Sequence, residues 1–258
     1  MISIIIPTYN EERNIVSLIR YLKENGKELI SDIIVVDGGS NDNTVELAFA
    51  EGVKVLLNSV KSRAAQMNFG ASEAMGEILY FVHADVLPPK EFAYDIIQSF
   101  QQGYDAGNFS SAFKSSRFLL RLNSWMSKSS HLFFRGGGDL SLFITKQAFQ
   151  CLNGFDEKFV IMEDFDKVRR IKKSFRFAAL QSKIVVSPRK YEYNAYWKVS
   201  MAYTLTYFFF RFGASPDFLL KFYKCLIRDQ HGNTCLPDKK QTVVPIGEYC
   251  HLVKNDTL

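Results

Sequence analysis

Short apolar runs alternate with amphipathic stretches along the first part of the chain. The first run, residues 2–6, is β-branched and predicts a buried strand that stops at Pro7. Further runs of this kind predict strands at 33–36, 53–57 and 78–82. Between the runs, apolar residues recur at helical spacing and predict helices at 10–26, 44–50, 62–75 and 88–102. Strands that alternate with helices over short connections favour a mostly parallel sheet flanked by helices, in the α/β class.

The regular alternation ends after Gly103. Beyond it, the pattern predicts strands at 106–113, 140–144, 175–180 and 184–186. It predicts helices at 146–152, 165–174, 196–212 and 217–227, and the last two are amphipathic and rich in aromatic residues. We therefore expect one domain over residues 1–228, divided near residue 103 into the halves 1–103 and 104–228, with a polar tail at 229–258.

The composition is that of a globular protein with a sizeable core, since 47% of the 258 residues are hydrophobic and 23% are charged. The net charge of +5 is unevenly spread. Two windows, 106–138 and 167–191, hold many lysines and arginines and no acid. Such windows indicate either a solvated helix face or a surface that meets anionic lipid or an anionic substrate. Nucleic acid is a weaker option, because no helix-turn-helix, zinc-finger or RRM signature accompanies the charge.

The cysteines fit neither a zinc site nor a disulfide scaffold, and they lie at Cys151, Cys225, Cys235 and Cys250. The amino terminus lacks a basic leader, and the most apolar late stretch, 195–212, is interrupted by Lys198, Ser200 and Arg211. We therefore expect a cytoplasmic protein without a membrane span.

Acidic residues stand at the ends of predicted strands. Asp85 follows the apolar run 78–82, and Asp37 follows the run 33–36. In an open α/β sheet, ligands bind at the carboxyl ends of the strands. The late pair Glu163 and Asp164 adds two more carboxyl groups. These acids indicate a polar, metal-assisted active site, although each also suits a turn or a helix cap.

Asp85 is the foremost candidate for a metal ligand. Mg²⁺ and Mn²⁺ take hard oxygen ligands, commonly one or two carboxylates plus the phosphates of a substrate. An acid at a strand end beside a diphosphate would meet that need. His83 is either a second ligand, a partner that orients Asp85, or a satisfied buried histidine.

Polar groups near the first and third helices suit a nucleotide or a sugar. The segment 7–12 joins a strand end to a helix start, where free backbone N–H groups can bind an anion or the edge of a base, or simply cap the helix. Asp37 can accept hydrogen bonds from a ribose or a base, or close a turn. Arg63, Gln66 and Asn68 near a helix start offer a cation and two amides, or an exposed polar face.

The pair Glu163 and Asp164 is a candidate for the general base that takes a proton from an incoming hydroxyl. Acids at a helix start are also stabilised by the helix dipole, so capping is the alternative. Neighbouring residues on a helical turn point in different directions, and we expect only one to face the cleft. Gly137, Gly138 and Asp139 lie in a glycine-rich segment that is either an acceptor loop or a passive connection.

Segments in four places, taken in order, resemble the inverting glycosyltransferases of family 2, which have the GT-A fold. They are residues 7–11 (Pro-Thr-Tyr-Asn-Glu), 35–40 (Val-Val-Asp-Gly-Gly-Ser), 83–85 (His-Ala-Asp) and 154–156 (Gly-Phe-Asp) with 163–164 (Glu-Asp). The resemblance covers roughly residues 1–190. Residues 62–68 and the His-Ala-Asp segment resemble a bacterial subgroup, the rSAM/selenodomain-associated transferases 2.

The resemblance implies transfer of a sugar from a nucleoside-diphosphate donor to a hydroxyl acceptor, with inversion and with Mg²⁺ or Mn²⁺. It implies a Rossmann-like, nucleotide-sugar-binding first half and an acceptor-binding second half. Donor contacts are implied at Pro7, Tyr9, Glu11, Asp37 and Ala84.

The implied metal ligand is Asp85, with His83 beside it, and the implied base is Asp164, with Glu163 as the alternative. His83 departs from the first acid of the family's Asp-x-Asp motif, and Gly38 replaces a second acid of many relatives. The donor nucleotide therefore stays open. A nucleotidyltransferase and a catalytically idle nucleotide-sugar-binding protein are the alternative functions, although the glycine-rich Lys/Arg loop of the former is absent.

The aromatic, basic helices after residue 195 favour either burial in the core or in a homodimer interface, or contact with an anionic membrane surface, as for a lipid-linked acceptor. The second alternative would place the protein on the inner face of the membrane as a peripheral protein.

Overall fold

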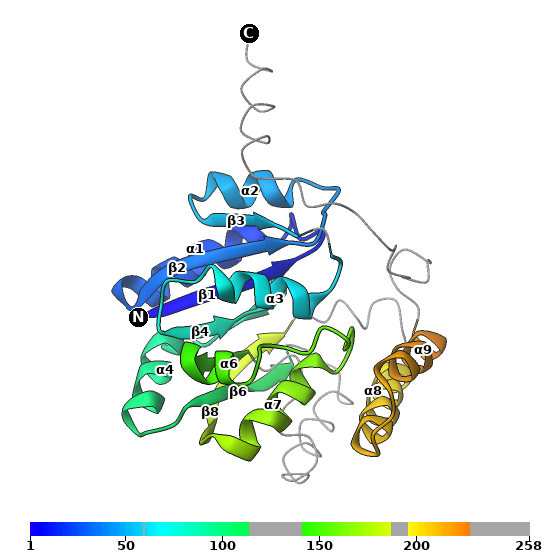
Figure 1. The fold of residues 1–258 in the computed structure, drawn as a ribbon. Helices are drawn as coiled ribbons and strands as arrows, with labels where there is room; N and C mark the ends of the chain where they lie inside the picture. Colours follow the sequence, from blue (N-terminus) through cyan, green and yellow to red (C-terminus); the bar gives the residue numbers. More distant parts are fainter. Residues whose placement is uncertain (59, 114–140, 187–195, 228–258) are drawn as a thin grey trace.

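A computed structural model describes residues 1–58, 60–113, 141–186 and 196–227 of the chain (Figure 1). The elements of the first half are β1 (Ile2–Thr8), α1 (Ile15–Gly26), η1 (Lys27–Leu29), β2 (Ile30–Asp37), α2 (Thr44–Ala50), β3 (Lys54–Leu57), α3 (Arg63–Ser72), β4 (Ile78–Phe81), β5 (Val86–Leu87) and α4 (Phe92–Gln101). Those of the second half are β6 (Ala106–Phe113), β7 (Leu142–Thr145), α6 (Lys146–Cys151), α7 (Glu163–Ser174), β8 (Phe177–Val186), α8 (Tyr196–Arg211) and α9 (Pro216–Leu226).

All strands join one eight-stranded sheet in the order β3-β2-β1-β4-β7-β6-β8-β5. The strands β3, β2, β1 and β4 are parallel, as expected. In the second half, β7 is antiparallel to both β4 and β6, whereas β8 is parallel to β6 and antiparallel to β5. The α/β prediction is confirmed, and the sheet is parallel in its first half and mixed in its second.

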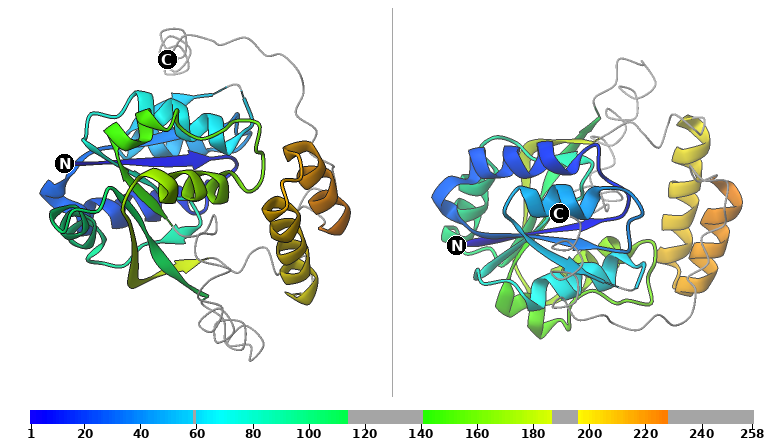
Figure 2. Two further views of the ribbon diagram at one scale, coloured as in Figure 1. Left: turned by 60° about the horizontal axis from the view of Figure 1, so that its bottom comes forward. Right: turned by 90° about the horizontal axis from the view of Figure 1, so that it is seen from above.

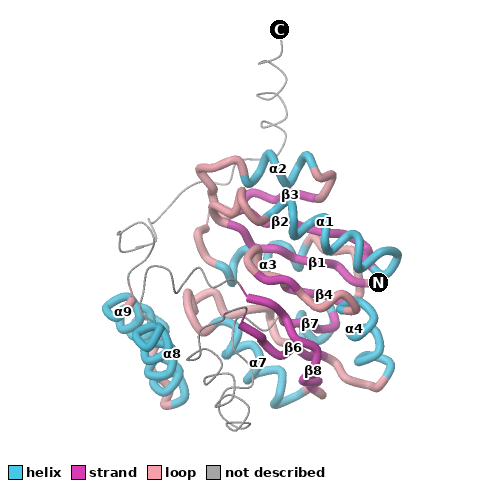
Figure 3. Tube along the Cα trace, turned by 180° about the vertical axis from the view of Figure 1, so that it is seen from behind, coloured by secondary structure: helices cyan, strands magenta, loops and turns pink. Residues whose placement is uncertain are grey.

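Helices cover both faces of the sheet (Figures 1 and 3). Apolar side chains form one buried cluster on each face. All seven residues of β1 are buried. Successive strand residues point to opposite faces, so Ile4 packs on the side of α1 and α4 and Ile5 on the side of α3. A Cβ on Gly70 would lie 2.6 Å from Ile5 Cγ2. Glycine at this position therefore allows α3 to approach β1 closely, which fixes the start of α3 beside the carboxyl end of that strand.

The helices α8 and α9 form a hairpin beside the carboxyl ends of the first strands (Figure 2). A separate apolar cluster of Phe159, Met162, Phe210 and Leu219 joins the hairpin to the segment before α7. Within the described part of the chain, no helix combines the length and apolarity that crossing a bilayer needs.

Several element boundaries differ from the predictions. β1 continues through Pro7 to Thr8, and α1 begins at Ile15 instead of residue 10. Asn10 has a φ of 55°, in the left-handed region, so this residue is not itself helical. The backbone N–H groups of residues 10–12 donate to the side chains of Ser40, Thr44 and Asp42, so this segment binds the loop after β2.

In the second half, β8 is one strand where the sequence predicted two. A register irregularity follows Phe109, where Ser110 Oγ donates to the carbonyls of Gln181 and Ser182, and this bulge carries the strand across the polar interruption. The helix α7 begins at Glu163, so the acidic pair lies in its first turn and not before it. The segment 137–139 and the tail from residue 229 onward lie outside the described residues.

Candidate active site

A cavity of about 290 Å³ lies at the carboxyl ends of β1 and β4 and the start of α3. This is the edge where an open α/β sheet binds its ligands. The residues that line the cavity are Pro7, Thr8, Tyr9, Glu11, Arg63, Gln66, His83, Ala84, Asp85, Ile161, Tyr203 and Tyr223. We call it the strand-end cleft, and eight of the predicted site residues line it.

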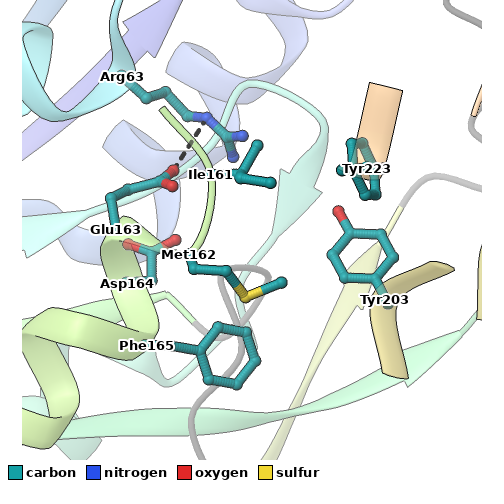
Figure 4. A pocket seen from close by; sticks show the side chains of 8 residues that line it. All are labelled: Arg63, Ile161, Met162, Glu163, Asp164, Phe165, Tyr203 and Tyr223. Carbon is teal, nitrogen blue, oxygen red and sulfur yellow. Dashed lines mark ion pairs between the residues drawn. The ribbon is translucent and has the colours of Figure 1, made fainter. Parts of the chain in front are cut away.

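A smaller cavity of about 40 Å³ shares Arg63, Ile161, Tyr203 and Tyr223 with the cleft (Figure 4). Its other lining residues run from Met162 to Phe165. Both Glu163 and Asp164 line this cavity, and neither lines the strand-end cleft itself. Met162 has a φ of 66° just before the helix, and this left-handed turn aims the first turn of α7 at the cavity. The positive end of the helix dipole stabilises the carboxylates there.

Four polar side chains connect the two cavities. Arg63 Nε lies 3.3 Å from Glu163 Oε1, and Arg63 Nη1 lies 3.3 Å from His83 Nδ1. His83 Nε2 lies 4.0 Å from Asp164 Oδ2. The side chain of Glu163 is 3% exposed and that of Asp164 is 10% exposed. Arg63 and His83 therefore each lie beside one of two nearly buried carboxylates.

Asp85 lies just beyond β4, in a tight turn where the N–H of Val86 donates to the carbonyl of His83 at 3.1 Å. The side chain is half-buried and lines the strand-end cleft. Within the described ranges, its carboxylate makes no hydrogen bond or ion pair. Asp85 is thus an acceptor-only group directed at the cleft, with its oxygens available to a ligand.

Asp37 and Asn68 do not line the cleft. Asp37 is 1% exposed and accepts hydrogen bonds from the N–H groups of Gly39 (2.8 Å) and Ser40 (2.7 Å) and from the hydroxyl of Thr8 (3.2 Å). The Asn68 side chain donates to the carbonyl of Phe155 and accepts from its N–H. Both side chains therefore hold loops of the surrounding wall.

Gln66 lines the cleft, but its amide nitrogen forms hydrogen bonds with the backbone of β1 and β2. Gln66 Nε2 donates to the carbonyls of Thr8 (2.8 Å) and Val36 (2.7 Å). The side chain thereby ties α3 to the ends of β1 and β2. Its position fixes Arg63, which lies one turn earlier on α3.

Sequence reasoning missed Tyr203, Tyr223 and Ile161. The tyrosine rings meet edge to face with centroids 5.3 Å apart, and they close the cleft opposite Arg63 (Figure 4). The only signal in the sequence was the aromatic richness of the last helices, which does not tell which ring faces a cavity. Gly137, Gly138 and Asp139, expected as an acceptor loop, lie outside the described residues.

The cleft offers limited ligands for a divalent cation. No group of three or more His, Cys, Asp or Glu side chains with metal-binding geometry exists in the part of the chain that the structure describes. Asp85 supplies one available carboxylate, which fits Mg²⁺ or Mn²⁺ of the kind held mainly by the phosphates of a substrate.

The sequence profile named "Glycosyl transferase family 2" matches residues 3–151. The chain belongs to this family. The match covers β1 to α6, and so includes Asp85 and the strand-end side of the cleft. It favours glycosyl transfer over the nucleotidyl transfer that the sequence left open.

Curated relatives match this family 2 glycosyltransferase over part of their length. It is 32% identical over 114 residues to "Undecaprenyl-phosphate 4-deoxy-4-formamido-L-arabinose transferase" of Aeromonas hydrophila, covering 41% of this chain and 35% of that protein. The protein of the same name from Pseudomonas aeruginosa is 31% identical over 114 residues, with 41% and 34% covered. The chain thus spans about a third of the length of these relatives.

Solved structures confirm the GT-A fold. The mannosyltransferase PcManGT of Pyrobaculum calidifontis, in complex with GDP-Man and Mn²⁺, has a TM-score of 0.61 at 21% identity over 84% of this chain and 66% of its own. TarS 1–349 of S. aureus has a TM-score of 0.59 at 15% identity, over 86% and 69%. Glucosyl-3-phosphoglycerate synthase of Mycobacterium tuberculosis has a TM-score of 0.57 at 17% identity, over 82% and 79%.

Proposed function

We propose that this chain transfers a sugar from a nucleoside-diphosphate donor to a hydroxyl acceptor, with inversion at the anomeric carbon. The observation that carries the proposal is that two carboxylates line two adjoining cavities of a family 2 fold. Asp85, just beyond β4, lines the strand-end cleft, Asp164, in the first turn of α7, lines the smaller cavity, and Arg63 lines both.

The donor occupies the part of the strand-end cleft formed by β1, the start of α3 and the β4 turn. Pro7, Tyr9 and Glu11 form one wall, and Ala84 and Asp85 form the other. Asp85 is the residue that would hold Mg²⁺ or Mn²⁺ there, and such a cation would supply positive charge to stabilise the diphosphate leaving group. The structural neighbours named above that were solved with Mn²⁺ and a nucleotide support this assignment. Asp37 and Asn68 contribute by holding the loops that shape the site.

Asp164 is the general base. The acceptor oxygen attacks the anomeric carbon as the bond to the diphosphate oxygen breaks, and the hydroxyl proton passes to the Asp164 carboxylate. A single displacement of this kind inverts the anomeric centre. Glu163 is the less suitable base, because its carboxylate forms an ion pair with Arg63 at 3.3 Å.

The outer side of the α8–α9 hairpin supports a membrane surface as a partner. Met201, Leu205 and Phe208 are exposed and recur on one side of α8, and Phe212, which follows the end of the helix, is 76% exposed. The helix α8 contains no acid, and Lys198 and Arg211 stand near its ends. We propose that this face rests on anionic lipid, with the inner face of the hairpin, at Tyr203 and Tyr223, turned to the cleft. The relatives named as undecaprenyl-phosphate transferases support an acceptor that is linked to a lipid.

A sedimentation assay tests the membrane proposal. The protein is mixed with vesicles of phosphatidylcholine, with and without phosphatidylglycerol, and we expect binding to the anionic vesicles that the double variant F208D/F212D loses. The matched control is Phe49→Asp, which charges an equally exposed ring on α2. Absence of binding to both vesicles contradicts the proposal, and a loss of self-association in F208D/F212D would assign this face to a homodimer.

The test of the proposed function is incubation with UDP-, GDP-, dTDP- and CDP-sugars, with Mn²⁺ and with acceptors that carry a free hydroxyl, such as a polyprenol or a sugar, beside a polyprenyl phosphate, followed by detection of free nucleotide. We expect release of a nucleoside diphosphate and a product of inverted anomeric configuration by NMR. Release of pyrophosphate from an NTP would instead identify a nucleotidyltransferase. Nucleotide-sugar binding without turnover for every donor and acceptor would identify an idle binding protein.

A further inference from the structure

His83 occupies the position between Arg63 and Asp164. Its Nδ1 atom lies 3.3 Å from Arg63 Nη1, and its Nε2 atom lies 4.0 Å from Asp164 Oδ2. The imidazole thus has one nitrogen toward a cation and the other toward a carboxylate. Its side chain is 14% exposed, so bulk water reaches the ring only in part.

The chemistry of the neighbours determines the tautomer. A guanidinium group has only N–H donors and no acceptor. The hydrogen bond between Arg63 and His83 therefore requires Nδ1 to accept. A neutral imidazole has one acceptor nitrogen and one N–H, so the proton lies on Nε2. That N–H is the group nearest to the Asp164 carboxylate.

This tautomer leaves His83 poorly suited to bind a cation. A metal ligand needs the lone pair of a neutral ring nitrogen, and the lone pair on Nδ1 already accepts from Arg63. A divalent cation at Nδ1 would also lie within a few ångströms of the Arg63 charge, where like charges repel. Nε2 carries the proton and offers no lone pair.

We infer that His83 is a positioning residue for Asp164 and not a ligand of the metal, an inference that rests on the proposed role of Asp164 as the base. The donors and acceptors of the cluster follow one order. The Glu163 carboxylate orients Arg63, Arg63 donates to His83, and the N–H of His83 points toward Asp164. The last distance of 4.0 Å is longer than a hydrogen bond, and catalytic contacts often tighten only when the substrate binds. We expect this contact to shorten on substrate binding and then to hold the Asp164 carboxylate in the orientation that receives the acceptor's proton.

The tautomer can be tested without any donor or metal. The chain contains four histidines, so a long-range ¹H–¹⁵N spectrum of histidine-labelled protein has few signals, and His83→Gln identifies the signal of residue 83. We expect the Nε2–H tautomer at mildly alkaline pH. The Nδ1–H tautomer, or a doubly protonated ring, would overturn the inference, because neither can accept from Arg63.

Metal binding provides the second test. Free Mn²⁺ is measured by EPR in the presence of UDP or of GDP for the wild type, His83→Gln and Asp85→Asn. We expect His83→Gln to stay within about twofold of the wild type, and Asp85→Asn to bind at least about 10-fold more weakly. Equal weakening in both variants would overturn the inference and make His83 a ligand. If the wild type binds no Mn²⁺ with either nucleotide, the metal part of the proposed function fails, and the tautomer alone decides the inference.

Steady-state kinetics distinguish a role of His83 in positioning Asp164 from a role in packing alone. His83→Ala is expected to lower kcat by about 10- to 100-fold with little change in the donor KM. His83→Gln restores part of kcat, because its amide again offers a donor and an acceptor. A rise in KM with unchanged kcat, or no rescue by glutamine, would contradict a positioning role.

Discussion

The ends of β2 and β4 carry the same sequence pattern and use it in opposite ways. Each is a buried apolar strand that leads to an aspartate at the same edge of the sheet. Asp37 after β2 is 1% exposed and accepts several hydrogen bonds from its own loop and from Thr8. Asp85 after β4 is half-buried and directed at the cleft, without a partner in the described ranges. The difference lies in the partners: one carboxylate is saturated by the protein, and the other is left for a ligand.

The largest expected effect concerns Asp164, the proposed base in the first turn of α7. Asp164→Asn should lower kcat by about 10²–10⁴-fold, because the amide cannot take the acceptor's proton. Donor binding should change little, and isothermal titration with the nucleotide measures it. The matched control is Asp166→Asn, on the same helix but bonded to Arg169 and Arg170 away from the reaction, and it should keep turnover near the wild-type level. Equal loss of turnover in both variants would contradict the assignment.

Asp85→Asn tests whether the carboxylate after β4 binds the metal. A ligand at about 100 times its dissociation constant stabilises the wild type by about 2.7 kcal/mol, a rise in Tm of roughly 5–10 °C at this chain length. We expect the Mn²⁺-dependent part of this rise to vanish in Asp85→Asn, as measured by thermal shift with UDP and GDP. The Tm of the ligand-free protein should hardly change, because no group in the described part of the chain bonds to this carboxylate. A manganese-dependent rise that persists in the variant would remove Asp85 from the metal site.

The corresponding change at β2 should give the reverse result. Asp37→Ala leaves the N–H groups of Gly39 and Ser40 without their acceptor, at a cost of about 2 kcal/mol in the free energy of unfolding. Urea denaturation of the ligand-free protein measures this cost, with Asp85→Ala as the paired control. Equal free energies of unfolding for the two variants would contradict the conclusion that Asp37 supports the fold and Asp85 does not.

Lys167 on α7 is a buried cation whose charge also depends on its surroundings. It is fully buried, and its ammonium donates to the carbonyl of Gly154 at 2.7 Å and lies 4.2 Å from the centroid of the Phe149 ring. Burial, and secondarily the charge of Arg170, lowers the pKa of Lys167 from 10.5 to about 7. Between these two values the unfolded chain binds more protons than the folded one, so the free energy of unfolding should rise with pH.

The slope from Lys167 is at most about 1.4 kcal/mol per pH unit, and it should vanish below the folded pKa, where both states are protonated. Urea denaturation from neutral to alkaline pH measures it. Lys167→Met should flatten the dependence in this window. An unchanged slope in that variant would show that the buried ammonium keeps its proton throughout.

The regular first half of the fold could be predicted closely from the sequence. The helix at Thr44–Ala50 has the predicted bounds, because the local apolar period alone defines it. In the second half, the strand at Ala106–Phe113 has its predicted bounds for the same reason. The start of α1 was wrong, since the N–H groups of residues 10–12 bind side chains of the β2 loop. The bulge that unites β8 also depends on a neighbouring strand. Boundaries failed where a distant segment supplied the hydrogen bonds.

The residues of the candidate site on β1, α3, α7 and the β4 turn were predicted, and those on the α8–α9 hairpin were missed. Asp85 and Arg63 were predicted because strand ends and helix starts can be located from the apolar pattern, and Glu11 because the resemblance to family 2 implies it. Tyr203 and Tyr223 were missed, because the direction of a ring on α8 or α9 depends on how the hairpin packs against Phe159 and Met162.

The sequence by itself determined the alternation of strands and helices, and therefore the edge of the sheet at which the acids collect. Only the tertiary structure decided which acid is saturated and which is available. It also decided that Arg63 lies between Glu163 and His83, and that His83 faces Asp164. The physical reason is that strand formation depends on neighbours along the chain, whereas the state of a carboxylate depends on donors brought to it by other elements.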